Sequence, residues 1–202
     1  MVDKFMVGRP KTLNREHALA IALEGYWREG VYGMSVNEVC RRAKISKPGL
    51  YREFGGEDGL LTAVLQLYRE TVMETLAKHL RQDSSFKEVF HWYVNALLHQ
   101  NGHPPGCLLC EMRLIQNENL GESTRMKVQE CTDDIYGYYR NWIERAQTKG
   151  EIAAEVDLDT AARLLDSQMM TASLKAYRGG NVDKIKEELQ MGLWRLTPDL
   201  EL

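Results

Sequence analysis

The sequence predicts an all-α protein of about nine helices. Apolar residues recur three and four positions apart along almost the whole chain, which is the spacing of one face of a helix. Charged residues fill the gaps, and the sequence lacks alternating runs of β-branched residues long enough for a strand. Glycine, proline and helix-capping residues divide this pattern into segments. These observations favour helices packed on helices.

The helices can be placed in order from their caps and breaks. Capping boxes, in which each side chain satisfies a backbone N–H of the first turn, are expected at Ser35 with Glu38 and at Ser85 with Glu88. Ser46 is a further cap, and Pro48 is tolerated in the first turn of its helix. The predicted helices cover residues 14–29, 36–43, 47–53, 57–81, 86–100, 107–119, 122–148, 158–178 and 182–196.

Composition excludes several classes of protein. Of the 202 residues, 44% are hydrophobic and 27% charged, which are ordinary values for a globular protein. The sequence has neither the long apolar run of a membrane helix nor the apolar core of a signal peptide. Its 4 cysteines are too few for a disulfide scaffold. We expect a cytoplasmic protein with reduced thiols and no membrane contact.

The short helices over 36–43 and 47–53 form the most informative segment. A three-residue turn joins them and a longer helix lies on each side, an arrangement typical of a helix-turn-helix, whose second helix enters a DNA major groove. Hydroxyl and basic side chains near the two helix N-termini suit phosphate contacts. The candidate DNA-binding residues are Ser35, Ser46, Lys47, Pro48, Gly49, Tyr51 and Arg52, above a small core of Val39, Ile45, Leu50 and Phe54.

The charge distribution agrees with a polyanion partner at this end. Residues 1–54 carry a net charge of +4, whereas the whole chain carries −3. Ahead of the first helix, the segment Gly8-Arg9-Pro10-Lys11 has two interpretations. Arg9 belongs either to an arm that lies in an A·T-rich minor groove or to a basic tail without fixed structure.

Residues 33–61, GMSVNEVCRRAKISKPGLYREFGGEDGLL, resemble the signature of the TetR family of bacterial regulators. The resemblance covers about residues 12–65 and includes an aliphatic–Ser–Lys turn followed by Leu-Tyr-x-x-Phe. It implies a DNA-binding domain over 1–56 and an effector-binding and dimerisation domain over 57–202, with 57–81 as the connecting helix. The sequence departs from the usual pattern at Lys44, Pro48, Glu53 and Glu57. Glu53 is expected to accept from a cytosine amino group or to point at solvent.

The resemblance also implies a homodimeric repressor on a palindromic double-stranded operator, released by a small-molecule effector. The two last helices are expected to bury Leu165, Met169, Ala172, Leu189 and Leu193 against a second subunit, with an intramolecular core as the alternative. Large side chains of the C-terminal part are candidates for an effector pocket between helices. They are Phe90, Trp92, Tyr93, Met112, Tyr136, Tyr139 and Met169.

Cys107 and Cys110 form a C-x-x-C motif at the expected start of a helix. A helix N-terminus and the nearby His103 favour a reactive thiol, which predicts a redox, electrophile or metal sensor as an alternative function. Packing is the other interpretation, since an i, i+3 pair inside a helix is poorly shaped for a disulfide. Only His99, His103 and Cys131 are further candidate metal ligands, so no metal site is predicted.

No catalytic motif supports an enzyme. The five histidines have no plausible triad setting, and the sequence lacks a P-loop, a Rossmann glycine motif and H-E-x-x-H. We therefore expect no catalytic residues and no cofactor. A helical ligand-binding or scaffold protein that does not contact DNA is a third hypothesis, distinguished by absent or salt-insensitive DNA binding.

Overall fold

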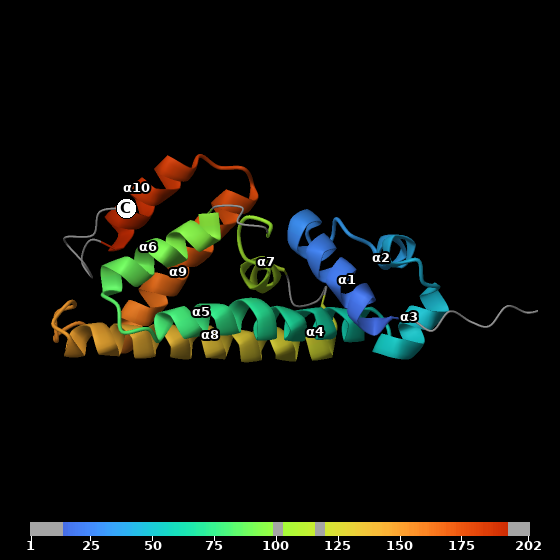
Figure 1. Cartoon of the computed structure of the whole chain (residues 1–202), viewed down its shortest axis with the longest axis horizontal. Helices are drawn as coiled ribbons and strands as arrows, with labels where there is room; N and C mark the ends of the chain where they lie inside the picture. The colour runs from blue at the N-terminus through green and yellow to red at the C-terminus, as the bar shows by residue number, and fades with distance from the viewer. Residues whose placement is uncertain (1–13, 99–102, 116–119, 194–202) are drawn as a thin grey trace, which may run out of the picture.

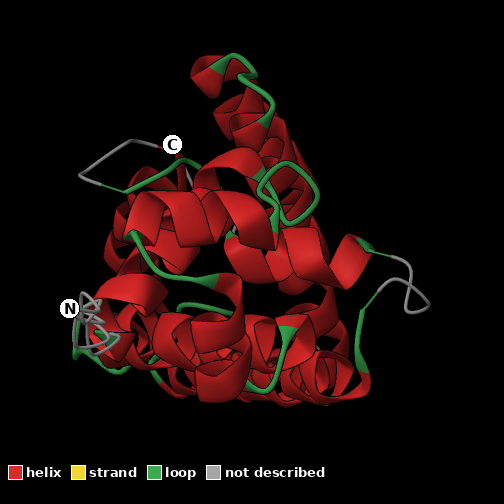
Figure 2. Ribbon diagram, turned by 90° about the vertical axis from the view of Figure 1, so that its right-hand side faces the viewer, coloured by secondary structure: helices red, strands yellow, loops and turns green. Residues whose placement is uncertain are grey.

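The computed structural model describes residues 14–98, 103–115 and 120–193, and every regular element within these ranges is helical (Figures 1 and 2). With α4, η1 and α5 taken as one continuous helix, the described residues form the nine helices that the sequence predicts. Their bounds are α1 (Arg15–Glu29), α2 (Val36–Ala43), α3 (Lys47–Phe54), α4 (Glu57–Tyr68), η1 (Arg69–Met73), α5 (Glu74–Leu80), α6 (Phe86–Leu98), α7 (Leu108–Leu114), α8 (Glu122–Thr148), α9 (Leu158–Tyr177) and α10 (Val182–Leu193).

The helices are arranged around one long axis. The short helices α2 and α3 lie with α1 at one end of the molecule, and α6, α9 and α10 lie at the other (Figure 1). The continuous helix α4–η1–α5 links the two ends and packs along α8. In turn α9 packs on α8, and α10 packs on α9. Buried apolar side chains form one core that extends through both ends.

One of the two predicted capping boxes is complete and the other is half formed. Ser85 Oγ accepts from the Glu88 N–H at 3.2 Å, and the Glu88 carboxylate accepts from the Ser85 N–H at 2.9 Å. At α2 only the first half is present, with Ser35 Oγ accepting from the Glu38 N–H at 3.2 Å. The Glu38 carboxylate instead binds two arginines of its own helix. Those charge-assisted bonds are stronger than a bond to a neutral N–H.

The connecting helix contains a π-helical turn that the sequence pattern did not predict. At its end the Glu74 N–H donates to the Arg69 carbonyl, five residues earlier. The hydroxyls of Thr71 and Thr75 each donate to the carbonyl four residues before them, at 2.7 Å. Such bonds compete for the carbonyls of a regular helix and bend it. The irregular turn lies midway between the two ends of the molecule.

Several predicted boundaries differ from the structure or lie outside the described residues. The helix expected over 107–119 is shorter, because Cys107 and Ile115 have extended backbones on either side of α7. The expected helix ends at residues 100 and 196 lie outside the described ranges, as does Arg9. No helix within those ranges is both long and apolar enough to cross a membrane.

The residues predicted to meet a second subunit are buried within one chain. Leu165, Met169, Ala172, Leu189 and Leu193 are each at most 2% exposed. Because these side chains fill the core that joins α9 to its neighbours α8 and α10, they are not available to another molecule. The prediction that they form the dimer interface is therefore wrong, since the apolar face of each helix is covered intramolecularly.

Candidate DNA-binding face and ligand cavity

The turn between α2 and α3 is tight and has a left-handed residue. Lys44 has φ 55° and ψ 42°, and its N–H donates to the Arg41 carbonyl at 3.3 Å. Two residues later, Ser46 Oγ accepts from the Gly49 N–H at 3.2 Å and caps α3. Lysine is strained in this conformation, because a side chain disfavours it by roughly 1–2 kcal/mol. The turn nevertheless forms, since the caps on both sides fix it.

The predicted small core under α3 is present. Val39 and Leu50 are fully buried and Phe54 is nearly so, while Ile45 is half-buried. These residues attach α3 to α2 and to the start of α4. The opposite face of α3 is therefore directed outward.

The outward face gathers hydroxyl and basic groups. Lys47 Nζ lies 5.3 Å from the centre of the Tyr51 ring, a cation–π contact. The Tyr51 hydroxyl donates to Glu57 Oε1 at 3.1 Å. Gly49 is half-buried, and the other predicted DNA-binding residues within the described ranges are exposed, namely Ser35, Ser46, Lys47, Pro48, Tyr51 and Arg52. Such a face can bind a polyanion through charge and through hydroxyl and backbone donors.

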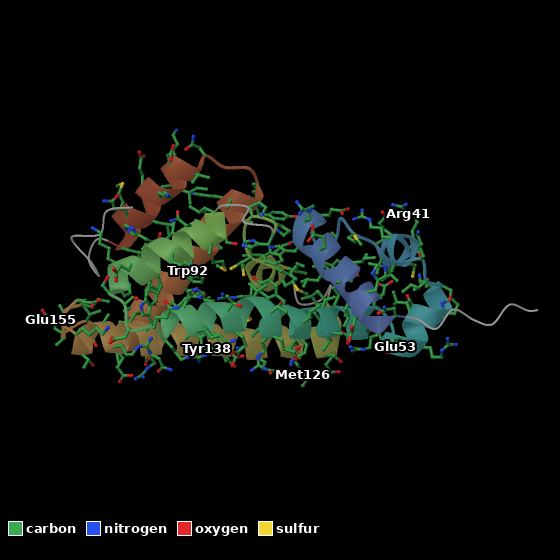
Figure 3. All side chains as sticks on the ribbon, in the orientation of Figure 1. Arg41, Glu53, Trp92, Met126, Tyr138 and Glu155 are labelled. Atoms are coloured by element: carbon green, nitrogen blue, oxygen red, sulfur yellow. The ribbon has the colours of Figure 1, made fainter. Side chains whose placement is uncertain are left out.

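Two acidic departures from the usual pattern have partners in the structure. Glu53 is exposed, as one of its two interpretations expects, and it also forms a surface ion pair with Arg15 of α1 at 3.4 Å (Figure 3). Arg15 also lies 5.3 Å from the centre of the Phe54 ring. Glu57 accepts the Tyr51 hydrogen bond. Both carboxylates therefore fix the position of α3.

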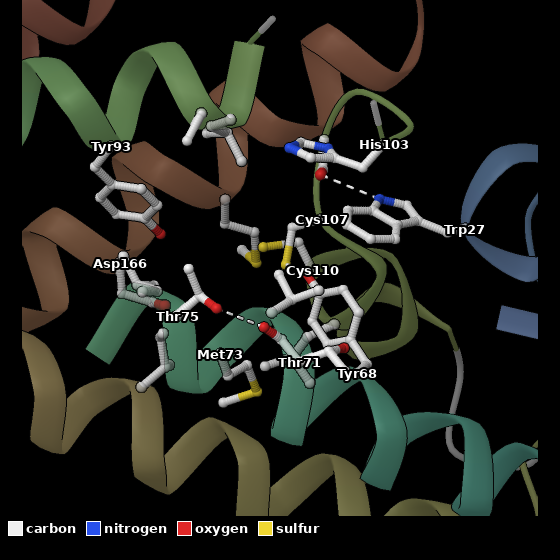
Figure 4. A pocket seen from close by; sticks show the side chains of 18 of the residues that line it. Trp27, Tyr68, Thr71, Met73, Thr75, Tyr93, His103, Cys107, Cys110 and Asp166 are labelled. Carbon is white, nitrogen blue, oxygen red and sulfur yellow. Dashed lines mark hydrogen bonds between the residues drawn. The ribbon is translucent and has the colours of Figure 1, made fainter. Parts of the chain in front are cut away.

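A cavity of about 270 Å³ lies between the connecting helix, α6, α7, α8 and α9 (Figure 4). Three of the predicted pocket residues line it: Trp92, Tyr93 and Tyr139. Side chains from α1 and the connecting helix also line it, which sequence reasoning did not include. The unpredicted lining residues with polar or aromatic groups are Trp27, Tyr68, Thr71, Thr75, His103, Arg113 and Asp166.

Four predicted pocket residues do not line the cavity. Phe90, Met112 and Met169 are at most 2% exposed and belong to the core. Met170, the next residue of α9, lines the cavity instead, because adjacent helical residues point about 100° apart. The Tyr136 ring lies against the guanidinium groups of Arg113 and Arg163.

The polar groups of the cavity wall are largely satisfied by one another. Arg113 donates to both carboxylate oxygens of Asp166, at 2.8 and 2.7 Å, and Asp166 is 4% exposed. The hydrogen bonds to Asp166 raise the pKa of Arg113 further. The Tyr93 and Tyr139 hydroxyls are 2.5 Å apart, and burial raises the pKa of both phenols. The wall thus presents a neutralised ion pair among apolar side chains.

Cys107 and Cys110 line this same cavity, so the structure joins two sites that the sequence left separate. Cys107 precedes α7 with φ −132° and ψ 122°, and the premise that both cysteines lie inside a helix is therefore wrong. Tyr68 Oη donates to Cys107 Sγ at 3.1 Å. Hydrogen bonds from Cys110, Tyr68 and two backbone N–H groups outweigh burial and lower the pKa of Cys107 to about 7. In the described residues no three His, Cys, Asp or Glu side chains are grouped as metal ligands.

The first helix reaches the cavity from the other end of the molecule. Trp27 Nε1 donates to the Gly106 carbonyl at 3.2 Å, and its ring stacks on His103 with centres 5.1 Å apart (Figure 4). Glu111 of α7 accepts from the Val31 N–H at 3.2 Å. The sequence signal for this contact is the Tyr26-Trp27 pair, because two adjacent large aromatics of one helix cannot both face a small three-helix core.

Comparisons with known proteins agree with this architecture. Residues 18–64 match the family model described as bacterial regulatory proteins, tetR family. The chain is 33% identical to the HTH-type transcriptional repressor BdcR of Escherichia coli K12, over 90% of this chain and 95% of that protein. It is 26% identical to the repressor ComR of the same strain, over 96% of this chain and 93% of that protein.

A solved structure shares the fold. A cysteine mutant of the TetR family transcriptional regulator CifR, in complex with a 26-base-pair double-stranded operator DNA, superposes with a TM-score of 0.77 at 22% identity. The match covers 92% of this chain and 98% of that one. The chain belongs to the TetR family of bacterial regulatory proteins.

Proposed function

We propose that this protein is a cytoplasmic, homodimeric repressor that binds an operator with α3 and is released by a small molecule in the cavity. The observation that carries the proposal is the helix-turn-helix formed by α2 and α3, whose polar face is exposed. Its function is binding, with no catalytic step. The relatives BdcR and ComR are described as transcriptional repressors, which supports the same role here.

The contacts with DNA divide into two kinds. Lys47 and Arg52 supply charge for phosphates, while Ser35, Ser46 and the Tyr51 hydroxyl supply short-range hydrogen bonds. Pro48 and Gly49 add little bulk, which allows the start of α3 to approach base edges closely. Tyr51 already has a carboxylate partner in Glu57, and that bond holds its hydroxyl at a fixed height.

The cavity contacts the two helices, α1 and the connecting helix, through which a ligand can act on the DNA-binding end. Its wall includes Trp27 of α1 and Thr71 and Thr75 of the connecting helix. A ligand alters DNA affinity only if it binds one arrangement of these helices better than another. Two recognition helices must lie about 34–36 Å apart to reach successive major grooves, so a small change of α1 or α4 is sufficient.

For the dimer we propose the outward faces of α9 and α10. Met191 of α10 is 75% exposed in the single chain, so a dimer through this face would remove it from water. Met191→Glu should weaken dimerisation, measured by light scattering during gel filtration. Met126→Glu is the matched control, because Met126 is 67% exposed on α8 (Figure 3). Equal dimerisation by both variants would assign the interface elsewhere.

The test of DNA binding is a titration of the purified protein onto the DNA that flanks its own gene. Affinity should fall steeply between about 50 and 200 mM salt, as expected for released counterions. Lys47→Ala should weaken binding and reduce the salt slope by about two, one for each protomer. Lys78→Ala removes an exposed lysine from α5 and should leave both the DNA affinity and the salt slope unchanged. Absence of any retardation at low salt would refute the proposal.

A further inference from the structure

Cys107 is one of two cysteines on the wall of the cavity. Its sulfur lies on the wall beside Cys110 and accepts from Tyr68 Oη at 3.1 Å (Figure 4). Its backbone N–H donates to Ser173 Oγ at 2.7 Å, which fixes the residue ahead of α7. The sulfur is therefore held at a defined place, with the Tyr68 hydroxyl of α4 directed at it.

The two thiols differ in protonation. The hydrogen bond from Cys110 is the largest of the effects that lower the pKa of Cys107 to about 7, and the same bond raises the pKa of Cys110. Near neutral pH Cys107 therefore carries the larger share of thiolate, while Cys110 stays a thiol. A thiolate, and not a thiol, is the nucleophilic form of cysteine.

The rest of the cavity favours a neutral organic molecule. Most of its wall is apolar or aromatic, and a volume of about 270 Å³ admits a small compound. The guanidinium of Arg113 is matched by both oxygens of Asp166, so it offers no net positive charge to an anion. The Cys107 thiolate adds a negative charge that disfavours anionic ligands further.

We propose that Cys107 is a covalent modification site for neutral, apolar carbon electrophiles such as α,β-unsaturated ketones. The thiolate attacks the β-carbon and forms a C–S bond, while the electron pair of the C=C bond moves to give an enolate. The enolate takes one proton from solvent, which leaves a neutral thioether. No oxidant or reductant is needed. Cys110 and Tyr68 act as positioning residues that stabilise the thiolate.

The adduct is placed to alter DNA affinity, and this part rests on the proposed function. Tyr68 and Trp27 are in edge-to-face contact, with ring centres 5.1 Å apart, and both line the cavity beside Cys107. Loss of charge at the sulfur removes the acceptor that orders Tyr68. Added bulk at the same position displaces the indole of Trp27, and with it the first helix of the DNA-binding end.

The first experiment measures the adduct without DNA. The reduced full-length protein is incubated with 2-cyclohexen-1-one, and the product is analysed by intact mass and peptide mapping. One adduct is expected, on Cys107. Cys107→Ser should gain none, while Cys131→Ser should react normally, because Cys131 is fully buried and burial raises its pKa to about 11. Preferential labelling of another cysteine, or labelling of Cys107→Ser, would overturn the proposal.

The pH dependence tests the roles of the neighbours. The rate of labelling should be half-maximal near pH 7, and Cys110→Ala should move that midpoint upward, whereas Cys110→Ser keeps a donor and should move it less. At pH 7 the wild type should react roughly three- to fourfold faster than a cysteine of ordinary pKa, after allowance for the weaker nucleophilicity of a low-pKa thiolate. The other ionisable groups facing the site are Tyr68, Tyr93, His103, Arg113, Tyr139 and Asp166. An unshifted midpoint in Cys110→Ala would contradict the assignment.

The second experiment separates the adduct from reversible ligand binding. Operator release is compared for 2-cyclohexen-1-one and for cyclohexanone, which has a similar size but no conjugated C=C bond and hence no electrophilic β-carbon. Release by the enone alone supports covalent capture, and equal release by both overturns it. A protein that forms the adduct but never binds DNA would refute the proposed function and leave the modification site standing.

Discussion

The DNA-binding end and the cavity are built from different kinds of contact. At α2 and α3 most side-chain hydrogen bonds join near neighbours, such as Ser46 with Gly49 three residues away, and the longest, from Arg42 to Glu29, spans 13 positions. At the cavity they join residues far apart in sequence, 53 positions for Arg113 with Asp166 and 79 for Trp27 with Gly106. The first region is therefore specified by local rules. The second exists only when several helices have already packed.

This difference predicts how each region responds to change. An exposed ion pair within one helix contributes little to stability, since water competes for both charges. A buried pair is different, because removing one partner leaves the other charge without solvent or counterion. Substitutions at buried pairs of the cavity should therefore cost more stability than substitutions at exposed pairs of α2 and α3.

Arg113→Ala should destabilise the protein by about 3–5 kcal/mol, because Asp166 then remains buried and unpaired. Urea denaturation monitored by circular dichroism measures the free energy of unfolding. Arg41→Ala is the matched control, since Arg41 pairs with Glu38 on the exposed surface of α2 and its loss should matter far less. The double variant Arg113→Met with Asp166→Leu should recover most of the stability. Equal effects of the two single variants would break the contrast between the regions.

Leu50→Ala tests whether the DNA-binding end has an energetically significant core of its own. Leu50 is fully buried under α3, and a cavity at such a position costs about 2–5 kcal/mol. We expect loss of operator retention, while the rate at which 2-cyclohexen-1-one labels Cys107 stays unchanged. A parallel loss of labelling would show that the two regions unfold together and are not independently stable.

The sequence was sufficient for the local region and insufficient for the cavity. Caps at Ser35 and Ser46 and the turn at Lys44 follow from backbone chemistry within a few residues, and the structure has them all. Periodicity also shows that one face of α9 is buried. It cannot show what covers that face, which is why Leu165 was assigned to a second subunit although its own chain covers it.

The cavity was only partly predictable for a related reason. Large aromatic side chains such as Tyr93 and Tyr139 indicate a pocket between helices, but not which rings line it. The pairing of Arg113 with Asp166 has no sequence signature, because the two residues belong to different helices. Trp27 belongs to the first helix, and helical periodicity does not show that this helix packs against the C-terminal part.

Trp27→Phe addresses the one residue that belongs to both regions. The substitution keeps an aromatic ring but leaves the Gly106 carbonyl without its donor, which should cost about 1–3 kcal/mol of stability. Labelling of Cys107 should continue, while the adduct should no longer change operator affinity as strongly. Trp92→Phe is the control, since Trp92 lines the cavity from α6 and stacks on His79. A full response in Trp27→Phe would place the coupling in the connecting helix alone.

Lys44→Gly should give the smallest effect and the opposite sign. Lys44 has φ 55°, so glycine relieves the left-handed strain of roughly 1–2 kcal/mol, but it also adds freedom to the unfolded chain, about 0.4–1 kcal/mol. We expect a net gain of about 0.5 kcal/mol in urea denaturation. Gly55→Ala is the mirror experiment, because Gly55 has φ 76° and an added Cβ meets no atom within 4 Å. Its loss of stability would measure backbone strain, reduced by the freedom that alanine removes from the unfolded chain and free of packing. If both variants shift stability in the same direction, the turn is held by contacts beyond its own backbone, and the DNA-binding end is less local than its hydrogen bonds indicate.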